Sequence, residues 1–142
     1  MMRLELKKLF FDTKGVRRKV DSATRRVLSR FGAFVRRTAK SSIRKRRKQS
    51  APGSPPSSHT GLLRRFIFFG YEPQRRSVVI GAARLEGKGR GRAPSILEYG
   101  GTTTITRRGK RTRALYRARP FMGPAFRKEK PKLSAMWRDS VR

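Results

Sequence analysis

The residues of this sequence that could do chemistry are mostly cations. Lys and Arg total 39 against 8 Asp and Glu, which gives a formal net charge of +31 at pH 7. The charge gathers in three tracts, at residues 44–48, 84–92 and 107–119. A guanidinium fork matches the oxygens of a phosphate, and phosphate contacts release counterions, so such tracts favour binding to a polyanion. The candidate contacts, to nucleic acid or to an acidic partner, are Arg44, Lys45, Arg46, Arg47, Lys48, Arg84, Lys88, Arg90, Arg92, Arg107, Arg108, Lys110, Arg111 and Arg113.

Groups that could support catalysis are few. His59 is the single histidine and stands in a Pro- and Ser-rich stretch, so neither a His-paired metal site nor a Ser-His-acid relay is expected. The acidic residues are scattered singly among basic ones, which predicts ion pairs rather than clustered ligands for a nuclease metal. Among them Glu98 stands out, and we expect it to pair with an arginine of its own chain or of a neighbouring subunit. We therefore expect no catalytic, cofactor or metal site, and a protein that is not an enzyme.

One short motif invites a nucleotide-binding interpretation that its context does not support. Residues 87–91 read GKGRG and superficially resemble a phosphate-binding loop. The Ser or Thr that follows the lysine in such loops is missing, and so is a strand-loop-helix pattern around it. The motif is therefore assigned to the basic tract and not to a nucleotide site.

Among DNA, RNA, anionic lipid and acidic protein, the arginine-rich charge favours nucleic acid as the partner. Base-specific recognition is not expected, because no recognition-helix or zinc-finger pattern is present. Aromatic residues do not interleave with the basic ones, which argues against a single-strand binder. No apolar run approaches the roughly 18 residues of a membrane span, and residues 1–12 suggest neither a signal peptide nor an anchor. Membrane binding is therefore not expected, and the absence of cysteine is compatible with synthesis in a reducing cytoplasm.

These residues must be positioned by one domain spanning 1–142, because the 35% apolar content supplies a single modest core. Residues 2–7 alternate between apolar and charged side chains, which predicts a short strand. From Asp12 or Thr13, either of which could cap a helix, a long amphipathic helix is predicted to run to about residue 46. Part of its apolar stripe is expected to pack against another copy of the chain. The stripe consists of Val16, Val20, Ala23, Val27, Phe31, Phe34, Ala39 and Ile43.

Loops and hairpins are predicted for the middle of the chain. Pro and Ser residues indicate a long irregular loop at about 47–60, and β-prone runs at 62–69 and 77–80 predict a hairpin. A Gly-rich basic loop follows at about 84–94. Residues 95–99 can form either a helical turn or the start of a strand.

A second hairpin and a closing helix complete the predicted fold. Runs at 102–106 and 112–118, rich in β-branched residues at their start, flank a basic loop at about 107–113. A helix is predicted from about Pro120 to Arg142, with a kink or restart at Pro131. The fold class is thus α+β, with a long N-terminal amphipathic helix packed on a small antiparallel β-sheet and a C-terminal helix.

Three short motifs, taken in order, carry a resemblance to a known family. The first is a TG-x-L-R element with Thr60, Gly61, Leu62 and Arg64; the second is an E-x-G element with Glu98, Tyr99 and Gly100. The third is an RPF-x-x-PA element with Arg119, Pro120, Phe121 and Pro124. Together with the long helix, they make the chain similar to the head-tail joining proteins of tailed bacteriophages. That family, also described as neck or tail-completion proteins, is typified by a tail-component protein of the lambdoid phage HK97.

Each motif also has a purely structural interpretation. Thr60 and Gly61 can lead the chain out of the Pro-rich loop into a strand, and Gly100 permits a sharp turn. Pro120 suits the first turn of a helix, where its missing N–H costs little. All three motifs are therefore candidate fold determinants as well as candidate subunit contacts.

The resemblance implies a non-enzymatic virion protein that forms a closed homo-oligomeric ring, expected to be a hexamer, at the head-tail junction. It implies other neck, connector and tail proteins as partners, and synthesis in the cytoplasm of a bacterial host. The basic tracts add genomic double-stranded DNA, bound without sequence preference, as a partner. The alternative is an RNA-binding protein of ribosomal type, which has a similarly small size, high pI and long basic helix.

Overall fold

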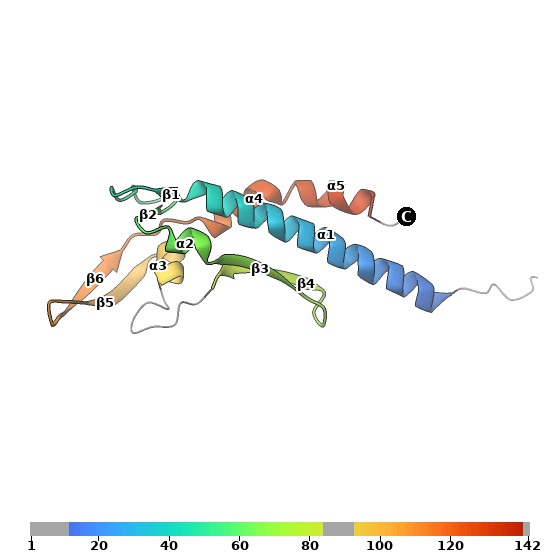
Figure 1. Ribbon diagram of the computed structural model, residues 1–142, viewed down its shortest axis with the longest axis horizontal. Helices are drawn as coiled ribbons and strands as arrows, with labels where there is room; N and C mark the ends of the chain where they lie inside the picture. The colour runs from blue at the N-terminus through green and yellow to red at the C-terminus, as the bar shows by residue number, and fades with distance from the viewer. Residues whose placement is uncertain (1–11, 84–92, 141–142) are drawn as a thin grey trace, which may run out of the picture.

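The computed structural model describes residues 12–83 and 93–140. The predicted strand at 2–7 lies outside these residues, as do four candidate contacts, Arg84, Lys88, Arg90 and Arg92. Over the described residues the fold is α+β, the predicted class: one long helix, antiparallel hairpins and a pair of C-terminal helices. The C-terminal helices lie alongside the long helix, and the hairpins lie on the opposite side of it from them (Figure 1).

The long helix α1 (Thr13–Ser42) begins as predicted and packs through part of its predicted apolar stripe. Asp12 caps it, because the Asp12 carboxylate accepts a hydrogen bond from the Gly15 N–H at 2.9 Å. Of the predicted stripe, the helical residues Ala23, Val27, Phe31 and Ala39 are buried, and they are joined by Val35, which the sequence analysis omitted. Val16 and Val20, in the first turns, are instead about two-fifths exposed (45% and 41%). The N-terminal part of the stripe is therefore uncovered in the single chain.

Phe34 was predicted to lie in the buried stripe, but it does not join the core. Its ring is half-buried and lies between two guanidinium groups, those of Arg30 and Arg37, each with its central carbon 5.8 Å from the ring centroid. These cation–π contacts lie on the flank of α1 and hold the two arginines along its surface.

The helix ends at Ser42, four residues before the predicted end, and this corrects the sequence analysis. Ile43 leaves the helix in an extended conformation and is fully buried, at 0% exposure. The next two residues form β1 (Arg44–Lys45), which pairs in parallel with β2 (Ser57–Ser58). Burial of Ile43 and pairing with β2 therefore outweigh the helical propensity of the basic run.

The first hairpin consists of β3 (Ile67–Glu72) and β4 (Ser77–Ala82) in antiparallel register. It packs closely against α1, since a Cβ on Gly32 would lie 2.8 Å from a Val78 methyl carbon and 2.9 Å from the Phe69 ring. The prediction that the strand begins at residue 62 is wrong. Residues 62–65 form a short helix, α2 (Leu62–Arg65), because Gly61 enters the left-handed conformation (φ +78°) and starts a helical turn.

The second hairpin forms near the predicted position, but the predicted loop at about 107–113 is wrong, because the strands extend to Arg107 and from Lys110 and leave a two-residue turn. Helix α3 (Ala93–Tyr99) precedes it, which settles residues 95–99 as helical, and β5 (Gly101–Arg107) pairs with β6 (Lys110–Tyr116). Arg108 and Gly109 both have positive φ, at 49° and 79°, as a two-residue type I′ turn requires. The two hairpins do not share a sheet; each is a separate two-stranded unit.

The C-terminal segment forms two helices, α4 (Met122–Glu129) and α5 (Lys132–Arg138), and the break at Pro131 is the predicted one. The first begins at Met122, so Pro120 precedes the helix and does not lie in its first turn. Helix α4 packs on α1, where the Phe31 and Phe126 rings meet edge to face at 5.8 Å between centroids. The core between α1, α4 and the first hairpin contains Phe31, Val35, Ala39, Ile43, Ile67, Phe121 and Ala125.

Candidate nucleic-acid interface

The first described basic tract, at 44–48, is exposed and follows α1, with residues 44–45 in β1 and a bend at residues 47 and 48. Arg44 stands opposite Ser57 and Lys45 opposite Ser58 in the β1–β2 pair. Successive side chains of an extended chain point to opposite sides. Arg44 and Lys45 therefore point to opposite sides of the β1–β2 pair.

Arg119 fixes the loop that carries this tract. Its guanidinium is buried (8% exposed), and its Nε donates a hydrogen bond to the Ser50 carbonyl at 2.9 Å. One Nη also donates to the Arg117 carbonyl, at 3.3 Å. Beside it, the Gly53 N–H donates to the Ala118 carbonyl at 2.9 Å. The 44–56 loop is thus held at two points by residues far along the chain, which the sequence analysis did not foresee.

A cavity of about 660 Å³ opens beside the tract. Alternate cations of the tract, Arg44, Arg46 and Lys48, lie along it, and no acidic residue does. The remaining lining residues are small or polar: Ser41, Ser42, Gln49, Ser50, Ala51, Ser54 and Pro55. A site with this lining suits an anion.

The second described tract forms the tip and one face of the β5–β6 hairpin. Arg107, Arg108, Lys110, Arg111 and Arg113 are all exposed. Arg111 stands opposite Thr106 and Arg113 opposite Thr104, so the two arginines share a face two residues apart. Their side chains are about 7 Å apart along the strand, a spacing comparable with that of successive phosphates on one DNA strand.

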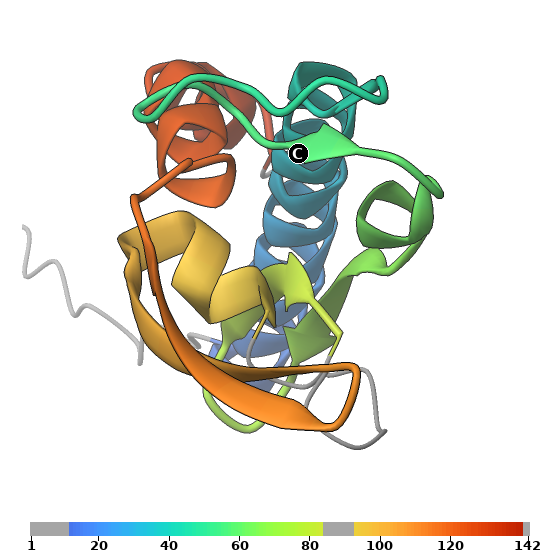
Figure 2. The ribbon, with the colours of Figure 1, turned by 90° about the vertical axis from the view of Figure 1, so that its left-hand side faces the viewer.

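The two tracts, about 60 residues apart in the sequence, lie at the same end of the molecule (Figure 1). Figure 2 looks onto that end and shows the 44–56 loop and the β5–β6 hairpin both turned toward the viewer. The structure therefore places two of the three predicted contact groups at one end of the molecule, on opposite edges of it in Figure 2, and the third lies outside the described residues.

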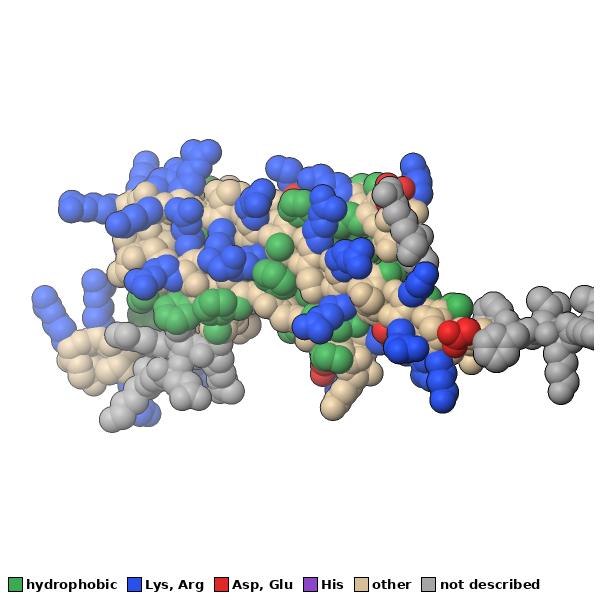
Figure 3. Space-filling model, turned by 45° about the vertical axis from the view of Figure 1, so that its right-hand side comes forward, with side chains coloured by type: hydrophobic (Ala, Val, Ile, Leu, Met, Phe, Trp, Pro, Cys, Tyr) green, Lys and Arg blue, Asp and Glu red, His purple; other side chains and the backbone are tan. Residues whose placement is uncertain are grey.

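Acidic groups do little to neutralise this charge. Among the described residues three ion pairs are formed: Arg76 with Asp21 at 3.2 Å, Arg75 with Glu72 at 3.8 Å and Lys132 with Glu129 at 2.7 Å. None of them involves either described basic tract. Figure 3 shows Lys and Arg side chains spread over one face of the molecule with few acidic ones among them.

Like charges also crowd at the junction of α1 and α2. Burial lowers the pKa of the Lys40 ammonium, and the positive charges of Arg36 and Arg64 lower it further. Arg64 belongs to the TG-x-L-R motif, and Arg36 donates from its Nε to the Ile67 carbonyl at 2.8 Å. The fold therefore tolerates repulsion between the cations of Lys40, Arg36 and Arg64 at this position.

The E-x-G and RPF-x-x-PA motifs form one joint. The Glu98 carboxylate accepts hydrogen bonds from the backbone N–H groups of Phe121, Met122 and Gly123, at 2.9, 3.0 and 2.8 Å. It thereby caps the start of α4 from a distant element. The expected arginine pair of Glu98 is corrected accordingly, because within the described residues its partners are backbone amides of its own chain.

Other motif residues complete the same joint. The Arg119 N–H donates to the Leu97 carbonyl at 2.6 Å, and Phe121 is buried at 1% exposure. Gly100, at φ +76°, leaves no room for a Cβ, which would lie 3.0 Å from the Ala118 nitrogen. Tyr99, in contrast, is 83% exposed. These motifs act as fold determinants, while Tyr99 remains available for contact with another molecule.

The TG-x-L-R motif starts α2 and does not open a strand. The Ser58 hydroxyl accepts a hydrogen bond from the Gly61 N–H at 2.9 Å, and the Thr60 hydroxyl accepts one from the Leu62 N–H at 3.4 Å. His59 beside them is exposed, as expected from its Pro- and Ser-rich surroundings. Within the described part of the chain, no three His, Cys, Asp or Glu residues gather as metal ligands.

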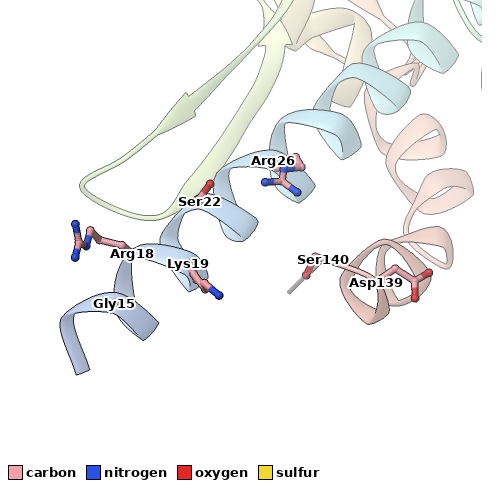
Figure 4. Close-up of a pocket in the computed structure, with 7 residues that line it drawn as sticks. All are labelled: Gly15, Arg18, Lys19, Ser22, Arg26, Asp139 and Ser140. Atoms are coloured by element: carbon pink, nitrogen blue, oxygen red, sulfur yellow. The ribbon is translucent and has the colours of Figure 1, made fainter. Parts of the chain in front are cut away.

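A second pocket lies at the opposite end, between the first turns of α1 and the end of α5 (Figure 4). The Lys19 side chain extends from α1 toward the space between the helices, whereas the Asp139 carboxylate points away from α1. The sequence analysis did not identify this pocket. Its lining residues are Gly15, Arg18, Lys19, Ser22, Arg26, Asp139 and Ser140.

Comparison with known proteins finds no relative of this chain. No protein-family model matches the chain, and neither does any curated protein or solved structure. A search of the described residues for a helix long and apolar enough to cross a membrane also finds none.

Proposed function

We propose that this chain is a virion structural protein that forms a ring at the head-tail junction of a tailed bacteriophage and contacts the passing DNA. The observation that carries the proposal is that two basic tracts far apart in the sequence lie at the same end of the molecule (Figure 1). Both tracts are exposed, and the described ion pairs leave their cations uncompensated. A ring of such ends would line the DNA path with positive charge.

The β3–β4 hairpin supplies the surface through which copies would associate. The middle of its outer face is apolar, with Phe68 49% and Val79 62% exposed and Gly81 and Gly70 opposite them, whereas Glu72 and Ser77 share this face at the turn. Both strands have an unpaired edge in the described structure, and such edges pair readily with another chain. Two copies that both carry a large positive charge repel each other, so they can come into contact only through uncharged surface or where bound anions neutralise the charge. Residues 66–71 and 77–83 carry no charge, so they meet that condition.

The proposed contact with DNA is diffuse and independent of sequence. Exposed Arg and Lys side chains reach phosphates, and no described element is arranged as a recognition helix. Contacts of this kind hold DNA loosely, which suits a passage through which the genome must leave. We further propose that the ring is six-fold and that its partners are the other neck, connector and tail proteins. The chain would have no catalytic activity.

The first experiment measures binding of the purified chain to duplex DNA of random sequence at roughly 50 and 200 mM salt. We expect affinity to fall by at least tenfold across that range, since each phosphate contact releases a counterion. Light scattering on the same samples should report a closed oligomer and not a monomer. Equal affinity at both salt concentrations, or a monomer that ignores DNA, would remove the basis of the proposal.

A second experiment separates the proposal from the ribosomal alternative. The chain should be found in a few copies in purified phage particles, and imaging should place it between head and tail. Sedimentation with ribosomal subunits, or a strong preference for ribosomal RNA over duplex DNA, would instead support the RNA-binding role.

A further inference from the structure

The cavity beside the first basic tract differs from the rest of the charged surface in its lining. Three cations, Arg44, Arg46 and Lys48, lie along it, and none of its lining residues is acidic. Its volume of about 660 Å³ falls within the range of roughly 300–1,000 Å³ that ligand sites occupy. The neighbouring cations Lys45 and Arg47 are not among its lining residues.

An unused hydrogen-bond donor lies in the wall of this cavity. The Ser50 Oγ is shielded from solvent and has no hydrogen-bond partner among residues 12–83 and 93–140. The Ser57 Oγ, on the residue paired with Arg44, is likewise buried without a partner. Buried hydroxyls are normally hydrogen-bonded, so two orphans flanking one basic tract call for an explanation. Two of the other lining hydroxyls differ, since those of Ser41 and Ser42 donate to the Thr38 and Ala39 carbonyls.

The wall that holds Ser50 is fixed before any ligand arrives. The Ser50 carbonyl accepts the hydrogen bond from the buried Arg119 guanidinium, and Gly53 is bonded to Ala118 three residues further on. A Ser hydroxyl reorients by rotation about a single bond, so the donor can turn toward the cavity without movement of this backbone. A donor carried on a backbone that is already fixed, beside three cations, lowers the entropic cost of binding an anion.

We propose that this cavity is a discrete site for one phosphate group, with the Ser50 hydroxyl donating to a phosphate oxygen and Arg44, Arg46 and Lys48 supplying the charge. A tetrahedral oxyanion has several acceptor oxygens, which can satisfy a hydroxyl and two guanidinium groups together. The inference rests on the proposed function in that the phosphate would come from the DNA backbone. Free inorganic phosphate has the same chemistry and allows the site to be tested without DNA.

The experiment is calorimetric titration of the full chain with inorganic phosphate, at an ionic strength held constant with chloride. Ser50→Ala should weaken phosphate binding roughly tenfold, the usual effect of losing one hydrogen bond to a charged group. The double variant Arg44→Gln/Arg46→Gln should abolish it. The matched control Lys45→Gln/Arg47→Gln removes the same charge from the same tract and should leave phosphate binding within twofold of the original value.

A second measurement guards against a variant that merely misfolds. Without phosphate, Ser50→Ala should raise the melting temperature, because it removes a buried hydroxyl that has no partner. Ser50→Ala should therefore be more stable and yet bind phosphate less tightly, a combination that damage to the fold does not produce. Phosphate binding unchanged in Ser50→Ala, or weakened equally in the control, would overturn the site.

Failure of the site and failure of the proposed function give different results. If the chain binds duplex DNA in a salt-sensitive way but does not bind phosphate beyond chloride, the site is refuted and the proposed function stands. If it binds phosphate with the expected pattern of variants but ignores duplex DNA, the site stands and the DNA-binding role is refuted.

Discussion

Glu129 is buried at the seam between α1 and α4, with 3% exposure. Its carboxylate accepts hydrogen bonds from the Lys132 ammonium at 2.7 Å and from the Thr38 hydroxyl at 2.6 Å. The Lys132 bond, followed by the Thr38 bond, lowers the pKa of the Glu129 carboxyl below its ordinary value of 4.5, despite the opposing effect of burial. The ionised form is therefore favoured in the folded chain.

Glu129→Gln should lower the free energy of unfolding at neutral pH by about 2 kcal/mol, because a charged acceptor is lost from a buried position. A depressed pKa stabilises the fold above the ordinary glutamate pKa, and this contribution is lost as pH falls through the lower folded value. The difference between the variant and the original chain should accordingly shrink when unfolding is measured below about pH 4.5. Glu72→Gln is the control, since its ion pair is longer at 3.8 Å and more exposed. A difference that stays constant down to the acid limit would contradict this role of ionisation.

At the level of single residues, burial and helix capping could be predicted better than long-range hydrogen-bond partners. The burial of Ala23, Val27 and Phe31 follows from their helical spacing, and Asp12 was one of two predicted caps. Glu98 was singled out correctly as unusual, but its partners lie more than 20 residues away on another element. Nothing local marks a carboxylate that caps a distant helix, because the encounter depends on the whole tertiary arrangement.

Among the elements, the loop that carries the first basic tract depends on Arg119. Arg119→Gln should release the anchor on the Ser50 carbonyl, so amide hydrogen exchange should rise across residues 46–56. Affinity for duplex DNA should fall about threefold to tenfold as the contacts lose their prearranged geometry. Arg117→Gln removes the same charge from an exposed position and should leave exchange in the loop unchanged. Equal exchange in both variants would show that the loop holds itself.

The β5–β6 hairpin permits a separate prediction on charge alone. Arg111→Gln/Arg113→Gln should leave stability within about 0.5 kcal/mol, because both side chains are exposed on the hairpin. It should reduce the slope of log affinity against log salt for duplex DNA by roughly 2, one for each lost phosphate contact. The slope is read from binding curves at four or more salt concentrations. A slope equal to that of the original chain would place the DNA elsewhere.

Elements were predictable where local chemistry decides them, and not where packing does. The Arg108–Gly109 turn and the break at Pro131 follow from backbone preferences that act within a few residues. The end of α1 was placed too late because the basic run after Ser42 has good helical propensity, whereas Ile43 is drawn into the core and β1 pairs with β2. The residues of β2 stand 13 positions further along the chain, beyond the reach of a local pattern.

For the whole molecule the central problem is self-association against a net charge of +31. Repulsion over such a surface is screened within about 8 Å at physiological salt, so contact between copies requires uncharged surface or bound anions. The outer face of the β3–β4 hairpin is uncharged around Val79 and Phe68. The N-terminal part of the α1 stripe, at Val16 and Val20, is also exposed but is interleaved with Arg and Lys.

Val79→Lys therefore tests how the molecule assembles. Val79 is 62% exposed and lies on the side of the hairpin away from α1, so the new side chain can reach solvent and the melting temperature of the monomer should hardly change. In an oligomer built through this face, however, a lysine would be buried against a like-charged neighbour, which costs several kcal/mol per contact. Sedimentation should show the original chain as an oligomer and Val79→Lys as a monomer at the same concentration. Leu115→Lys, at a 76% exposed position on the other hairpin, is the control and should remain oligomeric. If both variants assemble alike, the β3–β4 face is not the contact, and the exposed start of α1 becomes the surface to substitute next.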